Sequence, residues 1–576
     1  MTQINKRRIK TLFLLALFGI MIGVNPGMVD AYENPVVTIP EIQGDGFESP
    51  FPYDTYVDTY GIVTADYQAY GLKGGFFVQD PVGDGNPATS DGIYVYNYWY
   101  AVDVGDEVQL TGRVREYYGL TEIYAPYITI LSSGNPLPDP VELDPPFDDY
   151  ASDVYYEALE GMLVSVDRMR AIAGTDPYGE AAGVRSDTGI KRVFQDDPAG
   201  TGGIIFTDDA GGCLVNVRTG NTIVGLVGPL DYTYDEYKVL PSADNPPEVL
   251  STSWAESDWI YQKGLSWGFT VATYNMYNLF DEFDDPGKDD EPELYPPELV
   301  ELTLSKHAHA IKDILRLPDL VAVQEVENIA ILERLTETEP IAGIYGAVLI
   351  DGPDARGIDV GLLYRLDRVE VLSAEARQTC TDNPDLYGPG TDPNFPCDPG
   401  YNPLFSRPPL VVHLRTIVHS WWCRYRSGTD LWVIINHFKS KGVYHDPPNE
   451  DPEPRRIEQA EWVNHLVDEI QDCNRYAKVM VLGDLNSFAT EAPVHTLEDG
   501  GLWNLIYGVQ KSSRYSYIYR GVSEVLDYIM VSKSLIWRFI RARYVHFNVD
   551  FPYDYWADDP TTGIRSSDHD VFMCSF

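Results

Sequence analysis

The sequence predicts a multidomain protein in which two small β-barrels in tandem precede a larger, layered α/β domain. Two observations carry this prediction. Before about residue 245, apolar and polar residues alternate in short runs between Gly and Asp turns, which is typical of antiparallel barrels and sandwiches. After about residue 268, apolar strand-like runs alternate with helix-like stretches, which is typical of a layered α/β domain. A chain of 576 residues has room for several domains, each with its own core.

The first 31 residues are predicted to be a signal peptide. A basic start that includes Lys6 and Arg8 precedes a short apolar run, and the small residue Ala31 stands at a plausible cleavage point. An uncleaved membrane anchor is the alternative, but the apolar run is short for a bilayer span. No later segment is long and apolar enough to cross a membrane. We therefore expect a secreted, extracellular protein without stable membrane association.

The first barrel is predicted over residues 46–135 and the second over 150–245, with a Pro/Asp-rich linker at 136–149. The stretch TGNTIVGLVGPLDYTYDEYKV of the second barrel echoes GDEVQLTGRVREYYGLTEI of the first, which indicates a diverged repeat. A five-stranded barrel of the oligonucleotide-binding (OB) type fits both, and such barrels bind single strands through aromatic faces. The many tyrosines suit that use, but tyrosine is equally ordinary in strands, so both interpretations stay open.

The balance of charge is the main difficulty for any nucleic-acid function. The chain has 42 basic and 88 acidic residues, a net charge of −46, whereas polyanion binding usually leaves a basic footprint. Acidic surfaces also serve solubility, and carboxylate-rich loops can hold calcium. The acidic stretch FDEFDDPGKDDEPELYPPE, residues 280–298, is either a solvated face or a metal site. The charge indicates an environment and a need for cations, and it does not specify the function.

The six cysteines include no CxxC spacing, which argues against a zinc knuckle. Export makes disulfides permissible. Cys380 and Cys397 bracket a Pro/Gly/Asp-rich loop, where a crosslink would contribute roughly 3 kcal/mol by restricting the unfolded chain. Cys423 and Cys473 are a second candidate pair, although the sequence does not determine the pairing.

The α/β domain is predicted over residues 265–576, and its apolar strand-like runs repeatedly end in an amide, a carboxylate or an imidazole. One such run, VIINHFKSKG, delivers a histidine and then two lysines to a sheet edge, where ligands of open α/β folds bind. Mg²⁺ and Ca²⁺ prefer oxygen ligands, whereas Zn²⁺ would favour more His and Cys. The candidate residues that these runs end in or carry are Asn275, Glu325, His437, Asp484, Asn486 and Asp527, and the closing segment SSDHD adds Asp568 and His569.

Seven motifs occur in this order along the chain: TYNMYNLFD, VQEVEN, RGIDVGLLYR, NHFKSKG, VLGDLNSF, YSYIYRGVSEVLDYIMVS and SSDHD. Together they resemble the motifs of the endonuclease/exonuclease/phosphatase superfamily. Within it, they look most like secreted bacterial nucleases that carry β-barrel domains before the catalytic domain. The resemblance implies a four-layered α/β sandwich with the active site at one edge of two packed sheets.

The resemblance also implies a role for each matching residue. Asn275, Glu325 and Asp568 would hold a divalent cation, with Mg²⁺ as the first choice and Mn²⁺ or Ca²⁺ as alternatives. Asp484 would orient or activate the attacking water, and Asn486 would position that water and the phosphate.

Two histidines and three basic residues complete the implied site. His569 would contact the scissile phosphate with Asp527 as its carboxylate partner. His437 would act as a general acid or charge stabiliser, with Asp359 as its expected partner. In this interpretation the residues that contact phosphate or line its approach are Arg356, Lys439 and Lys441.

One position departs from the family pattern. Animal deoxyribonuclease relatives often place a basic residue two positions after the metal-binding glutamate, whereas Glu327 stands there in this chain. That phosphate contact is therefore not carried over.

Together these features predict a secreted, metal-dependent phosphodiesterase, in particular an extracellular DNA endonuclease with little sequence specificity. Nucleic acid, with DNA favoured, is the expected partner, and no protein partner is indicated. The rival interpretations are a phosphatase or lipid phosphodiesterase on the same scaffold, and a non-catalytic nucleic-acid-binding protein. The sequence does not distinguish DNA from RNA, or endo- from exo-cleavage.

Overall fold

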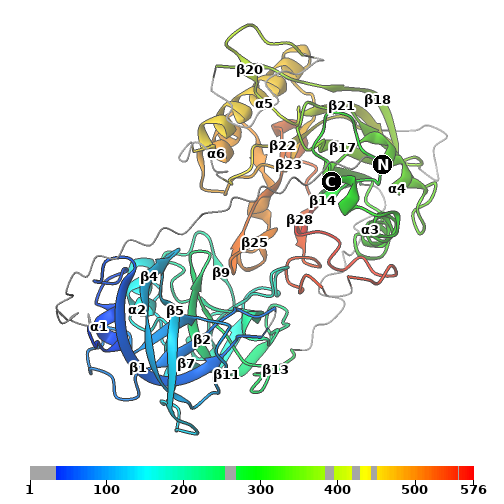
Figure 1. Ribbon diagram of the computed structural model, residues 1–576. Coiled ribbons are helices and arrows are strands. Elements are labelled where there is room, and N and C mark those ends of the chain that lie inside the picture. Colours follow the sequence, from blue (N-terminus) through cyan, green and yellow to red (C-terminus); the bar gives the residue numbers. More distant parts are fainter. Residues whose placement is uncertain are drawn as a thin grey trace, which may run out of the picture.

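The computed structural model describes residues 34–69, 71–252, 268–382, 395–417, 428–442, 451–554 and 557–576. The predicted signal peptide and Cys423 lie outside these ranges. Figure 1 shows two β-rich units, built from the N-terminal half of the chain, beside a larger unit of strands and helices. Across the described ranges, no helix has the length and apolar character to span a bilayer.

The first unit is a closed five-stranded barrel with the strand order β1-β2-β3-β5-β4. Residues of β4 alternate between buried and half-buried positions, so one face of the strand fills the barrel interior. A short helix precedes the barrel and begins at Thr38, which forms a capping box with Glu41. The elements are α1 (Ile39–Gln43), β1 (Thr55–Asp66), β2 (Phe76–Gln79), β3 (Gly92–Tyr96), β4 (Glu107–Tyr117) and β5 (Leu120–Ser132).

The second unit repeats this connectivity. Strand β11 pairs with β12 on one side and β7 on the other, so β7, β8, β10, β12 and β11 form a closed ring. In both rings the third and fifth strands pair in parallel, and the remaining neighbours are antiparallel. This shared order is what a diverged repeat predicts. The elements are β6 (Val141–Glu142), α2 (Asp149–Glu157), β7 (Leu163–Ala171), β8 (Ala181–Arg185), β10 (Ile205–Thr207), β11 (Thr222–Thr233), β12 (Glu236–Val239) and β13 (Glu248–Leu250).

The predicted linker at 136–149 contains a short strand. It contains β6, which pairs in parallel with β7 and extends the sheet of the second unit. The two-residue length of β6 explains why the sequence pattern did not reveal it, because a strand that short shows no alternation.

The α/β unit contains two six-stranded sheets, and the predicted run VIINH forms the end of a strand in the second of them. The first sheet has the order β16-β17-β15-β14-β29-β28 and the second has the order β18-β21-β22-β23-β27-β24. The first-sheet strands are β14 (Thr270–Leu279), β15 (Leu320–Val326), β16 (Tyr345–Leu349), β17 (Asp359–Arg365), β28 (Arg541–Val545) and β29 (Val571–Ser575). The second-sheet strands are β18 (Val369–Ala376), β21 (Leu410–Thr416), β22 (Asp430–His437), β23 (Val479–Asp484), β24 (Trp503–Asn504) and β27 (Asp527–Val531).

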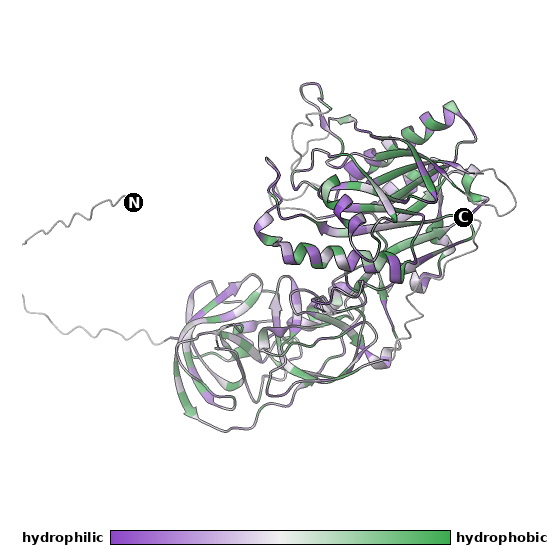
Figure 2. Ribbon diagram, turned by 90° about the vertical axis from the view of Figure 1, so that its right-hand side faces the viewer, coloured by the Kyte–Doolittle hydropathy of each residue, from purple (hydrophilic) through white to green (hydrophobic). Residues whose placement is uncertain are grey.

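Both faces of β15 are buried, which explains its continuous apolar sequence. Leu320 and Ala322 face the core that is shared with the second sheet, whereas Val321 and Val323 face the core shared with α3 and α4. Helix α5 packs against the second sheet through residues that include Ala460. Figure 2 shows hydrophobic residues along these central strands. The main helices are α3 (Pro297–His309), α4 (Ile329–Glu337), α5 (Glu453–Cys473), α6 (Ala492–Asp499) and α7 (Lys533–Ile536).

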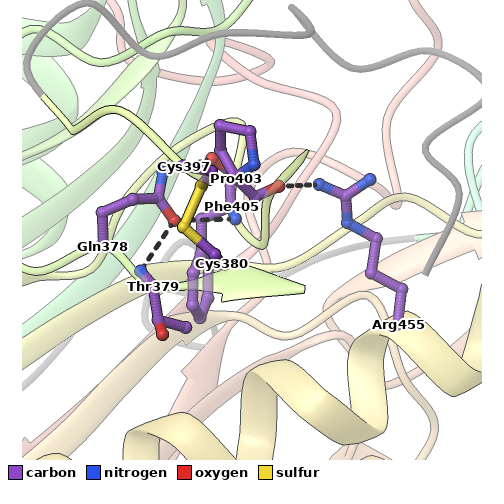
Figure 3. Close-up of a disulfide and its surroundings, with 7 residues drawn as sticks. All are labelled: Gln378, Thr379, Cys380, Cys397, Pro403, Phe405 and Arg455. Carbon is purple, nitrogen blue, oxygen red and sulfur yellow. Dashed lines mark hydrogen bonds between the residues drawn. A yellow bond between two sulfur atoms is a disulfide. The ribbon is translucent and has the colours of Figure 1, made fainter. Parts of the chain in front are cut away.

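The predicted disulfide between Cys380 and Cys397 is present. It joins the start of β19 (Cys380–Thr381) to a loop before β20 (Asn402–Pro403). Figure 3 shows Gln378 beside it, accepting the backbone N–H groups of Thr379 and Phe405 at 3.1 and 3.0 Å. From α5, Nη2 of Arg455 donates to the carbonyl oxygen of Pro403 at 2.8 Å. The crosslinked loop is thus held against α5.

The second barrel is joined to the α/β unit by a shared sheet. Strand β9 (Val193–Phe194) pairs in parallel with β26 (Val522–Glu524), which forms a hairpin with β25 (Tyr517–Tyr519). Figure 1 shows this hairpin reaching from the α/β unit to β9. Nη2 of Arg192 lies 2.6 Å from Oδ1 of Asp550, and both side chains are largely buried. The contact is therefore built from backbone pairing and a buried ion pair.

Candidate active site

Two predicted metal ligands stand at the ends of neighbouring parallel strands. β14 and β15 pair in parallel with Asn275 opposite Gln324, so both strands end at the same edge of the first sheet. At Glu325 the register of β15 shifts against both of its neighbours, β14 and β17. The φ of Glu325 is 59°, a left-handed conformation that is costly for a residue with a side chain. Such a bulge re-aims a side chain, which accounts for a carboxylate between buried Gln324 and Val326.

The amide of Asn275 connects the two sheets at this edge. Its Nδ2 donates to Oε1 of Glu325 at 3.1 Å and to Oδ2 of Asp484, on the second sheet, at 3.3 Å. The second oxygen of Glu325 accepts the backbone N–H of Asn278 at 3.1 Å. Both carboxylates therefore converge on one amide.

Three neighbouring strands of the second sheet place three predicted residues in a row. His437 is opposite Asp484 across β22 and β23, and Asp484 is opposite Asp527 across β23 and β27. Nε2 of His437 lies 3.6 Å from Oδ2 of Asp484 and 3.9 Å from Oε1 of Glu325. The edges of both sheets thus contribute to one site.

His569 and Asp527 form the pair that the resemblance implies. Nδ1 of His569 donates to Oδ2 of Asp527 at 2.8 Å, and the aspartate is fully buried. Burial alone would lower the pKa of His569, but the Asp527 charge, followed by those of Asp568 and Asp484, raises this pKa well above its ordinary value. The ring of Tyr517 packs on the imidazole with 4.8 Å between centroids. His569 is therefore oriented and positively charged, with Nε2 as the nitrogen that does not face Asp527.

His437 is neutral, and the structure does not pair it with Asp359. Burial lowers the pKa of His437 well below its ordinary value, and neighbouring cations, Arg407 first, lower it further. Nδ1 of His437 is buried and has no hydrogen-bond partner. The carboxylate of Asp359 instead accepts the backbone N–H of Gly352 at 2.8 Å, within its own loop. The expected His437–Asp359 pair is therefore not formed.

The carboxylates of the site have raised pKa values. Burial, together with the charges of Asp527 and Glu325, raises the pKa of Asp484 to about 7. Burial and Glu325 likewise raise the pKa of Asp568 to about 6. Oδ1 of Asp568 is buried without a hydrogen-bond partner. A bound cation inverts this kind of carboxylate repulsion, and the carboxylate oxygens of Glu325 and Asp568 are donors that suit Mg²⁺, Mn²⁺ or Ca²⁺. Oδ1 of Asn275 accepts the backbone N–H of Tyr277 at 3.0 Å, so its amide presents Nδ2 to the carboxylates.

Asn486 is hydrogen-bonded to Asp484 and lies just after the end of β23. Its backbone N–H donates to Oδ1 of Asp484 at 2.8 Å, and its Nδ2 donates to the carbonyl oxygen of Phe438 at 3.1 Å. Its φ of 46° is a second left-handed conformation at the site. The residue ties the end of β23 to the end of β22.

Two arginines border the site, and the sequence predicted one of them. Arg356 is exposed, and its charge contributes to the lowered pKa of His437. Arg407 was not predicted. It is buried, its Nη2 donates to the carbonyl oxygen of Phe438 at 3.1 Å, and its Nη1 lies 3.2 Å from Oδ2 of Asp354. Its sequence surroundings, SRPPL, carry no recognisable signal, so only the folded arrangement reveals it.

Neither Lys439 nor Lys441 is clearly placed to line the approach of phosphate. Lys441 forms an ion pair with Glu491, and its Nζ lies 3.5 Å from the centroid of the Phe488 ring. Its charge is already compensated, which weakens the prediction that it lines the approach of phosphate. Lys439 is half-buried, and its backbone N–H donates to Oε1 of Gln459 at 3.0 Å.

A further group of carboxylates is formed by two residues of the acidic stretch and by Glu327, which follows the end of β15. Oxygen atoms of Asp285, Asp290 and Glu327 all lie within 4.8 Å of one another. Glu327 is only 2% exposed and accepts the backbone N–H of Asp281 at 2.6 Å. Burial and these acidic neighbours raise the pKa of Glu327 to about 8. Glu327, which stands where relatives often have a basic residue, is thus buried against the acidic stretch. This part of the acidic stretch is therefore packed against the fold and is not only a solvated surface.

A family model bears on the same region. The model described as "Endonuclease/Exonuclease/phosphatase family" matches residues 270–388 and 425–551, a range that includes most of the predicted site. This match supports the assignment of the α/β unit to the endonuclease/exonuclease/phosphatase superfamily. A second model, described as a domain of unknown function, matches residues 137–251, which span the second barrel together with β6 and β13.

No curated protein matches the chain. Among solved structures, an endonuclease/exonuclease/phosphatase from Bacteroides vulgatus is 15% identical with a TM-score of 0.33, over 54% of this chain and 98% of that chain. TDP2 from D. rerio, in complex with a single-strand DNA product, is 17% identical with a TM-score of 0.34, over 54% and 98% of the two chains. At these TM-scores we draw no conclusion about this chain from either structure.

Proposed function

We propose that the protein is a secreted, metal-dependent phosphodiesterase that hydrolyses nucleic acid, cuts within the strand, and prefers DNA with little sequence specificity. The observation that carries the proposal is the meeting of strand ends from both sheets at one site. There, a charged histidine held by an aspartate stands beside a neutral histidine and a cluster of buried carboxylates.

The electrostatic demands of phosphodiester hydrolysis match this set. Negative charge on the phosphate repels hydroxide, and charge spreads over the equatorial oxygens during in-line displacement. A divalent cation held by Asn275, Glu325 and Asp568 would act as a Lewis acid towards that charge. His569 adds a second positive charge. Because Asp527 holds its Nδ1, Nε2 is the atom that donates a proton or a hydrogen bond to the phosphate.

Asp484 is the group that accepts the proton of the attacking water. Its carboxylate lies at the junction of the two sheets, where Oδ2 accepts Nδ2–H of Asn275 at 3.3 Å, and a carboxylate within hydrogen-bond reach of the attacking water can serve as general base. The neutral His437, whose Nε2 is 3.6 Å from Oδ2 of Asp484, is placed to share that proton. Asn486, hydrogen-bonded to Asp484, keeps this carboxylate oriented towards the site.

Polymeric nucleic acid is favoured over a lipid or a phosphomonoester by the units upstream. Two rings with the same connectivity precede the α/β unit, and barrels of the OB type bind single strands. Secretion is supported by the signal-like N-terminus and agrees with the disulfide between Cys380 and Cys397, because disulfides persist mainly in oxidising compartments.

The test is to incubate the purified mature protein with plasmid, linear DNA, RNA, a lipid phosphodiester and a phosphomonoester, with and without chelator. We expect plasmid to be nicked and linearised with Mg²⁺ or Mn²⁺, and chelator to abolish cleavage. The Glu325→Gln variant should be inactive, and its control, Glu370→Gln on the edge strand β18, should be fully active. Hydrolysis of the lipid or the monoester alone would overturn the proposal in favour of the rival enzymes.

A further inference from the structure

A cavity of about 980 Å³ lies between the second barrel and the α/β unit, and it reaches the proposed metal ligand Asp568. One wall comes from the barrel and includes Tyr178 and Tyr234. The other comes from the α/β unit and includes Tyr517, Tyr519 and the Asp568 carboxylate. Its volume is at the upper end of about 300–1,000 Å³, the range of ordinary ligand pockets. The cavity therefore extends the proposed catalytic site towards the barrel.

The two walls are fixed relative to each other. The hairpin of β25 and β26 pairs with β9 of the barrel, and the backbone N–H of Gln195 donates to the carbonyl oxygen of Ser523 at 3.2 Å. At the hairpin turn, a Cβ added to Gly521 would lie 2.8 Å from Cβ of Ala182. Nη2 of Arg520 donates to the backbone oxygen of Tyr234 at 2.8 Å. A ligand in the cavity would thus meet a preformed surface.

The lining is rich in tyrosine, and several of the rings are exposed. Tyr178 is 79% exposed, Tyr234 is 83% exposed and Tyr519 is 54% exposed. Exposed tyrosines also occur elsewhere on this chain, so what sets these apart is that they line one cavity together. Tyr517 joins this wall to the catalytic histidine, because its ring packs on His569. An aromatic path therefore leads from the barrel to the proposed site of phosphate cleavage.

The charges of the lining do not exclude a polyanion. Glu180 and Asp208 are both paired with Lys238, which is buried behind them. On the opposite wall Arg520 is paired with Glu236 at 3.2 Å, and Arg565 lies on the same segment as Asp568. Asp176 adds a further carboxylate to the lining, and Nζ of Lys238 lies 5.5 Å from the centroid of the Tyr234 ring. Binding of a strand here would therefore depend on stacking more than on a net positive charge.

We propose that this cavity binds the single-stranded stretch of nucleic acid next to the scissile phosphate, with its bases stacked on Tyr178 and Tyr234. Aromatic faces can stack only on unpaired bases, and stacking tolerates any base, which agrees with cleavage of low sequence specificity. This inference rests on the proposed function and adds a substrate-positioning role for the second barrel.

The hairpin-turn tyrosines of the two barrels offer a matched control. Tyr234 follows β11, and Tyr118 follows β4, the strand in the same place in the first ring. Both have φ above 50°, and Tyr118 is 84% exposed but does not line the cavity. An alanine at either position therefore removes an equally exposed ring from an equivalent turn.

The experiment uses the full mature chain. Binding of a fluorescent oligo(dT) strand is measured by anisotropy in the Glu325→Gln background, and kcat and KM on the same strand are measured in the active background. We expect Tyr178→Ala and Tyr234→Ala each to weaken binding about tenfold to a hundredfold, with the loss in KM more than in kcat. Tyr178→Phe and Tyr234→Phe should restore binding because the ring is kept, and Tyr118→Ala should bind like the parent protein.

Two outcomes separate this inference from the proposed function. If the wild type hydrolyses neither DNA nor bis(p-nitrophenyl) phosphate with Mg²⁺ or Mn²⁺, the proposed function fails. If the wild type cleaves DNA but the two alanine variants bind and cleave oligo(dT) like Tyr118→Ala, the cavity does not hold the strand and this inference is overturned.

Discussion

Replacement of Asp527 by asparagine tests whether this residue supports catalysis through His569 or serves only the packing of the fold. Asp527 is fully buried, and its Oδ2 accepts Nδ1–H of His569 at 2.8 Å. Asparagine keeps the shape and can still accept that hydrogen bond through Oδ1, but it removes the charge that raises the pKa of His569. A proton-transferring group of this kind contributes roughly 10²–10⁴-fold, so kcat should fall by about that factor, or about 2.7–5.4 kcal/mol in the barrier.

Stability should change much less than activity. Oδ1 of Asp527 is already buried without a partner, so the variant relieves an unsatisfied charge while it loses an ionic hydrogen bond. These effects offset each other, and we expect a difference of about 1 kcal/mol or less at pH 8, which corresponds to a Tm shift of about 2 °C or less. A merely structural aspartate would show the reverse pattern, a large change in Tm with kcat preserved in the folded fraction.

The raised pKa of His569 also predicts the direction in which the pH profiles of activity and stability should change. The raised pKa of His569 means that its charged form contributes stability below the pKa it has when unfolded, and that this contribution is lost as pH rises through the raised folded value. Without the carboxylate the folded pKa falls. The alkaline limb of kcat/KM should therefore move towards acid in Asp527→Asn, and the Tm difference from wild type should shrink as pH rises.

The assay is kcat/KM on bis(p-nitrophenyl) phosphate from pH 5 to 9, with Tm measured in the same buffers. If the pair acts as a unit, the double variant Asp527→Asn/His569→Ala should be little worse than His569→Ala alone. Multiplicative losses in the double variant would refute the paired role, because they would show that the two residues act independently.

Three further predictions concern the metal, the disulfide and the domain contact. Glu325→Gln should abolish nuclease activity while the free energy of unfolding in the presence of chelator stays within about 1 kcal/mol of wild type, since it removes a ligand charge with little change of shape; retained activity would exclude Glu325 as a ligand. Changing Cys380 and Cys397 to serine should lower the free energy of unfolding by roughly 3 kcal/mol and leave kcat at permissive temperature unchanged, whereas an unchanged denaturation midpoint would contradict the crosslink. Gly521→Ala, at φ 76° and facing the barrel, should destabilise the contact by about 1–3 kcal/mol and speed limited proteolysis between the units, and equal proteolysis rates would count against a fixed contact.

Much of the site was visible in the sequence because strands have a period of two and end at a common edge. The apolar runs ending at Asn275, Glu325, His437 and Asp484 identify both the strands and the residues they deliver, since parallel neighbours expose their carboxyl ends together. The pairing of His569 with Asp527 also followed from the resemblance, and the fold places them in contact. These features depend on local pattern and on motif order, both of which a single chain carries.

The tertiary structure alone decided which charges meet. Lys441 follows His437 closely in the chain, but Glu491, which lies far along the sequence, compensates its charge. Asp359 was expected beside His437, yet its own loop supplies a backbone N–H. Electrostatic partners are chosen by distance in space, and a sequence pattern does not contain that distance.

The contact between the barrel and the α/β unit was equally hidden. Strand β9 has two residues and pairs with β26 more than 320 residues later, so neither its length nor its sequence separation leaves a pattern to find. Local periodicity indicated the β-rich and α/β parts of the chain, and the motifs indicated the residues that the strands deliver, because both patterns are carried by residues that are neighbours in the chain. Only the folded chain decided that Tyr178 and Tyr234 share a cavity with Asp568, because a surface made by two units exists only once both have folded and docked.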